Sequence, residues 1–292
     1  MELSSSTTVV RSGRRSFPWQ GWVGALLVLT MWPANWLLPG IRTSWLFFPL
    51  WLGYALLVDG LVFMRIGTSL LTRSRQRYVG LFLVSIPVWW LFELINLRTQ
   101  NWFYLGVEVF SPLEFFILSS IAFSVVIPAV FGTAELAVSF GFIRNMRPWL
   151  VIRDDRSTTL TFFVIGWGML ALMLLWPRYF FPFVWISVYF ITEPLNVWLG
   201  NRSMVEYTRV GDWRPVVALF VGVLITGFFW EMWNYFSFPK WIYEVPGVGV
   251  AKVFEMPLLG YGGYLPFSLE LFAVYHLIMG WTAAKRTEYI TK

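Results

Sequence analysis

The sequence contains no cysteine and only one histidine, His276, among its 292 residues. Without cysteine the chain can form no disulfide, no thiolate metal site and no cysteine nucleophile. One histidine excludes a His-rich metal cluster and a pair of axial haem ligands. The P-loop signature and a complete G-x-G-x-x-G are missing, and Asp154-Asp155 has no second acidic cluster to complete a magnesium-diphosphate motif. We therefore expect neither a metal nor an organic cofactor.

Charged residues are also scarce. They make up 13% of the chain, whereas 58% is hydrophobic and the mean hydropathy is +0.64. Soluble domains have about 25% charged residues. The 28 Phe and 19 Trp add to the argument, because aromatic rings collect at the two faces of a bilayer. The composition predicts an all-α integral membrane protein.

Apolar segments recur along the whole chain. Each is about 18 residues or longer, the length that crosses roughly 30 Å of hydrocarbon. The sequence predicts eight transmembrane helices, at 21–38, 45–64, 78–96, 112–138, 159–177, 180–199, 215–234 and in a last segment ending near Ala284.

The basic residues lie mainly in alternate loops. The net charge is +6, and seventeen of the 22 Lys and Arg fall on one side of the predicted spans. Positive residues mark the cytoplasmic side. We therefore expect a multi-pass protein of the inner (plasma) membrane with both termini in the cytoplasm, and no nucleic-acid partner.

The chain shows weak internal similarity. A polar, basic segment at 1–20 precedes two candidate repeats of four helices, 21–145 and 159–292, joined by a charged linker at 146–158. Glu93-x-x-Asn96 recurs as Glu231-x-x-Asn234, and each pair is followed by a Trp-x-Tyr element. An even number of helices in each half predicts a parallel repeat about an axis along the membrane normal.

Three carboxylates are the candidate catalytic residues: Glu93, Glu114 and Glu231. Acids within a membrane are costly, so they usually face a bundle interior or a cavity. If the halves pack face to face, we expect the three to share one pocket near the outer leaflet and to be partly protonated. The residues expected to line it are Asn96, Trp102, Tyr104, Asn234, Trp241, Tyr243 and Glu270.

A purely structural interpretation stays open for these residues. Glu93 could pair with Arg98, and Asn96 and Asn234 could cap helix ends. Asp59 and Glu193, nearer the cytoplasmic side, could bridge helices. His276 is better explained as a packed histidine than as a ligand.

One stretch of the first half resembles a known family. The residues that carry the resemblance are Leu91-Phe92-Glu93, Asn101-Trp102-Phe103-Tyr104, Ser111-Pro112-Leu113-Glu114-Phe115-Phe116, Val126-Ile127-Pro128 and Glu135-Leu136. Together they resemble the lycopene cyclase domain, found in small integral-membrane carotenoid cyclases that work as two related halves. The resemblance is strongest over 85–136.

The resemblance implies acid-initiated ring closure of a linear carotenoid end, without net redox change. It makes Glu93 and Glu114 the candidate acids, with Glu231 as the second-half counterpart of Glu93. The sequence departs from the family's Pro-Leu-Glu-Glu motif in both halves. In the first half Phe115 replaces the second acid, and in the second half Leu259 takes the place of the first acid, so that no acid is left there.

Two other classes of function remain open. A non-catalytic membrane subunit could bind a carotenoid, quinone or lipid within a larger membrane-protein complex, and the loss of the second acidic motif favours it. A proton-coupled transporter would need acids spaced through the membrane, which Asp59 and Glu193 weakly support. The ligand that we expect these acids to meet is a hydrophobic isoprenoid or lipid.

Overall fold

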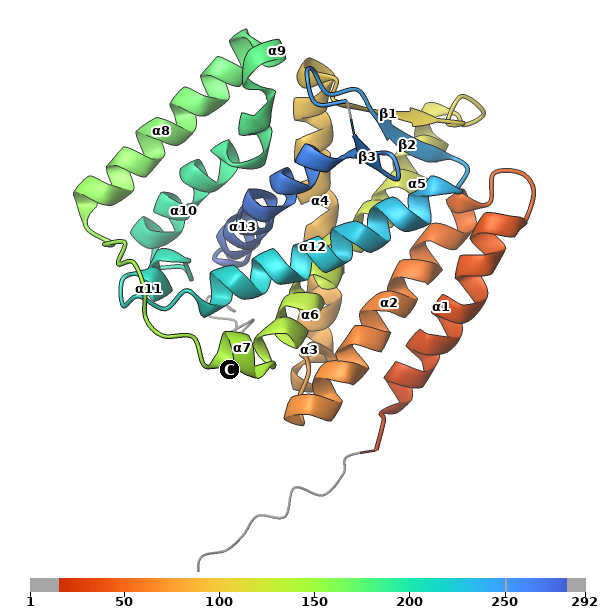
Figure 1. Cartoon of the computed structure of the whole chain (residues 1–292), viewed down its shortest axis with the longest axis horizontal. Coiled ribbons are helices and arrows are strands. Elements are labelled where there is room, and N and C mark those ends of the chain that lie inside the picture. The colour runs from red at the N-terminus through yellow and green to blue at the C-terminus, as the bar shows by residue number, and fades with distance from the viewer. Residues whose placement is uncertain (1–15, 250, 283–292) are drawn as a thin grey trace, which may run out of the picture.

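The computed structural model describes residues 16–249 and 251–282. Nine helices of twelve or more residues form its body (Figure 1). They are α1 (Trp19–Leu37), α2 (Thr43–Ile66), α4 (Arg75–Thr99), α5 (Pro112–Phe123), α6 (Val126–Val138), α8 (Arg156–Leu175), α10 (Ser187–Leu199), α12 (Arg214–Tyr235) and α13 (Tyr261–Met279). The short helices are α3 (Leu70–Arg73), α7 (Gly141–Arg144), α9 (Pro177–Phe180) and α11 (Val205–Thr208), with 3-10 turns η1 (Phe181–Trp185) and η2 (Leu258–Gly260).

The described chain is mostly helical, but fewer of its helices than predicted are long and apolar enough to cross a bilayer. Five described helices are long and apolar enough to cross a bilayer: α2, α4, the joined α5 and α6, α8 and α12. A sixth is obtained if the pair Pro177–Trp185 and Ser187–Leu199, bent by 41°, counts as one broken span. The other two predicted spans form the 19-residue helices α1 and α13, which bury polar residues such as Gln20 and Glu270. Ala284 lies outside the described residues.

Local sequence signals explain several helix boundaries. Gly67 ends α2 with a φ of 80°, a conformation that glycine adopts without strain. Ser74 starts α4 by accepting the Arg77 N–H. The α5 and α6 helices meet at a break where the Ser85 hydroxyl donates to the Phe123 carbonyl and accepts the Ile127 N–H. The break is thus satisfied by a side chain from α4.

The long helices pack in two similar sets. In one, α1 lies on α2, and α6 packs against α2 and α4; in the other, α8 lies on α10, and α13 packs against α10 and α12. The last helix of each set also contacts the other set, since α6 packs on α12 and α13 packs on α4 (Figure 1). Large buried side chains fill the centre, among them Trp51, Phe92, Phe131, Trp233, Phe267, Phe272 and Tyr275.

Small residues allow the closest helix crossings. A Cβ at Gly24 of α1 would lie 2.3 Å from the Leu57 nitrogen of α2. A Cβ at Gly222 of α12 would lie 2.7 Å from the Ala134 nitrogen of α6. Such contacts bring backbones together in membranes, where packing replaces the hydrophobic effect as the main attraction between helices.

The structure adds strands to the predicted all-α fold. Strand β1 (Trp102–Leu105) pairs antiparallel with β2 (Lys240–Tyr243), so that Trp102 faces Tyr243 and Tyr104 faces Trp241. A smaller pair joins β3 (Lys252–Val253) and β4 (Met256–Pro257). The strands gather at one end of the bundle, and α3, α7 and α11 lie at the other (Figure 1). We call the β1–β2 pair the ribbon.

The structure describes the end of the predicted N-terminal segment and all of the predicted linker. Of the segment 1–20, residues 1–15 lie outside the described part, and α1 begins within its end, at Trp19. The linker 146–158 runs along the loop before α12: Trp149 donates its N–H to the Gly211 carbonyl, and Trp213 donates its indole N–H to the Leu150 carbonyl.

Candidate functional site

Glu93 receives three hydrogen bonds on one oxygen. Its Oε1 accepts the indole N–H groups of Trp89 at 2.9 Å and Trp102 at 3.0 Å, and the Tyr104 hydroxyl at 2.5 Å. Trp89 lies one helical turn before Glu93 on α4, whereas Trp102 and Tyr104 come from the same face of β1, because side chains alternate along a strand. Arg98, which the sequence offered as an alternative partner of Glu93, instead donates to the Leu174 carbonyl of α8.

Glu231 is arranged in a related way on α12. Its Oε1 accepts the hydroxyls of Tyr243 at 2.8 Å and Tyr264 at 2.6 Å. The side chain is completely buried, and Oε2 has no hydrogen-bond partner among the described residues. The Trp241 indole, at the place that Trp102 takes in the first half, likewise has an unpartnered N–H within the described chain.

Burial raises the pKa of the Tyr104 and Tyr243 phenols well above the ordinary value, and the charge of the neighbouring carboxylate adds to the effect. Both hydroxyls therefore remain protonated and act as donors. The Tyr104 hydroxyl donates its proton to Glu93, and the Tyr243 hydroxyl donates its proton to Glu231.

The two asparagines hold the ribbon. Asn96 donates its amide to the Trp102 carbonyl at 2.8 Å and accepts the Asn101 N–H at 2.9 Å. Asn234 donates to the Trp241 carbonyl at 2.7 Å and accepts the Trp241 N–H at 3.0 Å. Each side chain thus satisfies backbone groups at the start of the strand that follows its helix, instead of capping its own helix.

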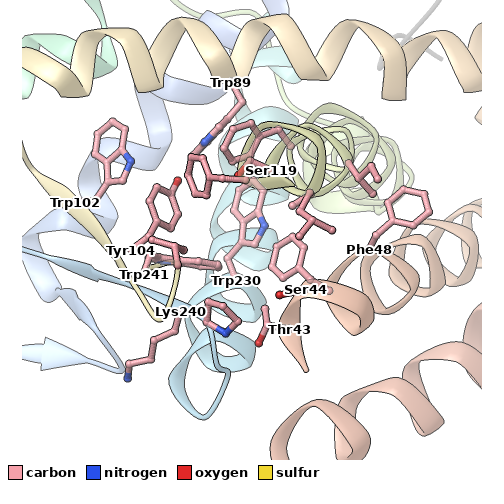
Figure 2. Close-up of a pocket in the computed structure, with 18 of the residues that line it drawn as sticks. Thr43, Ser44, Phe48, Trp89, Trp102, Tyr104, Ser119, Trp230, Lys240 and Trp241 are labelled. Atoms are coloured by element: carbon pink, nitrogen blue, oxygen red, sulfur yellow. The ribbon is translucent and has the colours of Figure 1, made fainter. Parts of the chain in front are cut away.

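A large apolar pocket lies beside these groups. Its empty volume is about 1130 Å³ when the open solvent at its mouth is included. Its walls include the donors to both carboxyls, namely Trp89, Trp102, Tyr104, Tyr243 and Tyr264, together with Phe47, Phe115, Phe123, Trp230 and Trp241. Figure 2 shows aromatic rings from α4, α12 and the ribbon converging on this space. The rings stand between the pocket and the two carboxyls.

Few polar groups interrupt the lining. Thr43, Ser44 and Ser119 bring hydroxyls to it. Lys240 contributes its stem, and its amine points away from the centre of the pocket (Figure 2), towards an ion pair with Glu255. The pocket therefore suits a mainly hydrocarbon ligand.

Two of the expected acids lie elsewhere. Glu114 is exposed, and its Oε2 accepts the N–H and hydroxyl of Ser111 in a capping box at the start of α5. Glu270 is completely buried on α13, where its Oε1 accepts the Val188 N–H at 3.0 Å. Side chains that bond Glu93 and Glu231 line the pocket, but the two carboxyls themselves do not. The other expected site residues outside the lining that the described residues form are Asn96, Glu114, Asn234 and Glu270.

The two acids expected nearer the cytoplasmic side also have hydrogen-bond partners. Asp59 accepts the Leu71 N–H at 3.0 Å, and Glu193 accepts the Val205 N–H at 2.7 Å. Each acceptor precedes its donor by twelve residues and anchors a short helix, α3 or α11. The same contact thus occurs once in each half of the chain.

Sequence reasoning missed Tyr264 as a site residue. Tyr264 lies in the first turn of α13, where its hydroxyl reaches Glu231. A tyrosine on a predicted helix near an intramembrane acid is the signal that could have found it.

Among the described residues, no group of three or more His, Cys, Asp or Glu is placed to hold a metal ion.

Comparisons with known proteins identify no relative of the chain. No protein-family model matches the chain, and no curated protein or solved structure matches it either.

Proposed function

We propose that the chain is a plasma-membrane enzyme that binds one end of a linear isoprenoid in the aromatic pocket and closes a ring by acid catalysis. The resemblance to the lycopene cyclase domain suggests this chemistry. The observation that carries the proposal is that the pocket walls are built from the same side chains that hydrogen-bond Glu93 and Glu231. A ligand in the pocket is thus separated from each carboxyl by one layer of rings.

Glu231 is the proposed acid. A protonated carboxyl has one O–H and one accepting oxygen. Because Oε1 accepts two tyrosine hydroxyls, the proton belongs on Oε2, and a neutral form avoids an unpaired charge in the bundle interior. The proposal requires the Trp241 or Tyr243 ring to move so that this proton meets the ligand.

The reaction balances without an oxidant. The acid transfers a proton to a terminal double bond, the resulting cation is attacked by a nearby double bond of the same chain, and a C–H proton leaves to restore an alkene. The faces of Trp230 and Trp241 stabilise the cation. Glu93, whose three donors compensate a negative charge, is the proposed base, with the Tyr104 hydroxyl between it and the pocket.

We also propose a 4+4 repeat about an axis along the membrane normal, with α1 and α13 as the two further membrane-crossing helices and both termini cytoplasmic. Three duplicated features support it: the Glu-tyrosine pairs, the Asn-strand contacts, and the acids that anchor α3 and α11. The ribbon then lies on the axis at the outer face.

A second candidate is a non-catalytic subunit that binds a carotenoid, quinone or lipid within a membrane complex. The rings between pocket and carboxyls favour it, because a binding protein needs no direct contact with an acid. The exposed position of Glu114 favours it as well, since one of the acids that the resemblance suggests then serves as a cap.

Expression in cells that accumulate lycopene, followed by chromatography of the pigments, tests the enzyme. We expect cyclic products with the unmodified chain and a loss of at least tenfold with Glu231→Gln, while Glu108→Gln, at an exposed loop carboxylate, retains activity. Unchanged lycopene together with a purified protein that carries pigment would contradict the enzyme and favour the non-catalytic binding subunit.

A further inference from the structure

The second half contains three acids that share an unusual state. Glu193, Glu231 and Glu270 are each completely buried, and in each Oε1 accepts hydrogen bonds while Oε2 has no partner among the described residues. The first-half counterpart of Glu193 differs, since Asp59 uses both oxygens: Oδ1 accepts the Leu71 N–H, and Oδ2 accepts the Ser69 hydroxyl.

These acids are arranged in sequence through the bundle. Tyr264 bonds Glu231 and lies six residues before Glu270 on α13, a rise of about 9 Å. Glu270 bonds the Val188 N–H, and Val188 lies five residues before Glu193 on α10, a rise of about 7.5 Å. Glu193 in turn bonds Val205 in α11. The series therefore extends from the ribbon end towards the opposite end of the bundle.

Additional hydroxyls lie along this series. Ser187, at the start of α10 and next to the residue that Glu270 bonds, has a buried hydroxyl without a partner among the described residues. Tyr189 precedes Glu193 by four residues and so shares its helix face. Buried polar atoms without protein partners are the usual binding places of ordered water. Acids with such neighbours are typical of proton relays in membrane proteins.

We propose that Glu193, Glu270 and Glu231 form a proton path that connects the α11 end of the bundle with the pocket. The path rests on the proposed function in one respect: it restores the proton that Glu231 gives to the ligand. Protons pass between carboxyls through water at Ser187 and Tyr189 and through the Tyr264 hydroxyl. Each transfer moves one proton from an O–H to a neighbouring oxygen.

The test is hydrogen-deuterium exchange of the Glu231 carboxyl, followed by infrared spectroscopy of the purified full chain in lipid after transfer to heavy water. The Glu231 band is assigned by its loss in Glu231→Gln. We expect exchange to slow at least tenfold in Glu193→Gln and in Glu270→Gln, because an amide keeps the backbone hydrogen bond and cannot relay a proton.

Asp59→Asn is the matched control, because it changes the equivalent acid of the first half without touching the path. Its exchange should equal that of the unmodified chain. Equal exchange in Glu193→Gln and Glu270→Gln, or a spectrum without a protonated Glu231 band, would overturn the path. The measurement needs no substrate, so a negative pigment assay with slowed exchange rejects the enzyme and keeps the path.

Discussion

The Asn234→Ala substitution should destabilise the chain because one side chain satisfies two backbone groups of the ribbon. The Asn234 amide donates to the Trp241 carbonyl at 2.7 Å, and its oxygen accepts the Trp241 N–H at 3.0 Å. An unpaired buried polar group costs about 1–3 kcal/mol. Two such groups give about 2–6 kcal/mol, and we expect the lower part of that range because Trp241 is only partly buried.

The assay is the free energy of unfolding in mixed detergent micelles as the fraction of denaturing detergent rises. Asn96→Ala should lose at least as much, since Asn96 holds the Trp102 carbonyl and the Asn101 N–H and both residues are buried. Asn145→Ala, at an exposed position, should stay within about 0.5 kcal/mol of the unmodified chain. A loss below about 0.5 kcal/mol in Asn234→Ala would refute the idea that this side chain secures the ribbon.

Three other substitutions test neighbouring features. Gly24→Leu should cost about 2–3 kcal/mol in the same titration because α1 and α2 would have to separate, whereas Gly80→Leu, with nothing within 4 Å of its added Cβ, should be nearly neutral. Tyr104→Phe removes a donor to Glu93 and should cost about 1–2 kcal/mol and reduce cyclic product; unchanged values in both would remove Tyr104 from the site. Ser119→Trp should fill the pocket, abolish ligand retention in the purified protein and leave unfolding unchanged, and retained ligand would place the binding site elsewhere.

The helical membrane class and part of the site follow directly from the sequence. Apolar length predicts α2, α4, α8 and α12, because crossing a bilayer requires long helices whose backbone groups bond internally. The repeated Glu-x-x-Asn followed by Trp-x-Tyr indicates which aromatic residues lie near each carboxyl, although it does not show that they form strands. Spacing alone indicates this proximity because each Trp-x-Tyr element begins within a few residues of its helix.

Other features depend on contacts between distant segments. The ribbon requires β1 to meet β2 across more than a hundred residues, so an all-α prediction could not include it. Glu114 looks like a catalytic acid beside Pro112, but Ser111-Pro112-Leu113-Glu114 is equally a capping box, and the local hydrogen bonds favour the cap. Tyr264 reaches Glu231 only because α13 packs on α12.

The most direct test of acid-initiated ring closure is the mass of the cyclic product formed in heavy water. Purified protein in lipid vesicles is incubated with lycopene in deuterated buffer, and the extracted pigment is analysed by mass spectrometry. Because the proton from Glu231 stays on carbon while a different C–H is lost, we expect one deuterium for each ring. Cyclic product without deuterium, or only unchanged lycopene, would contradict it.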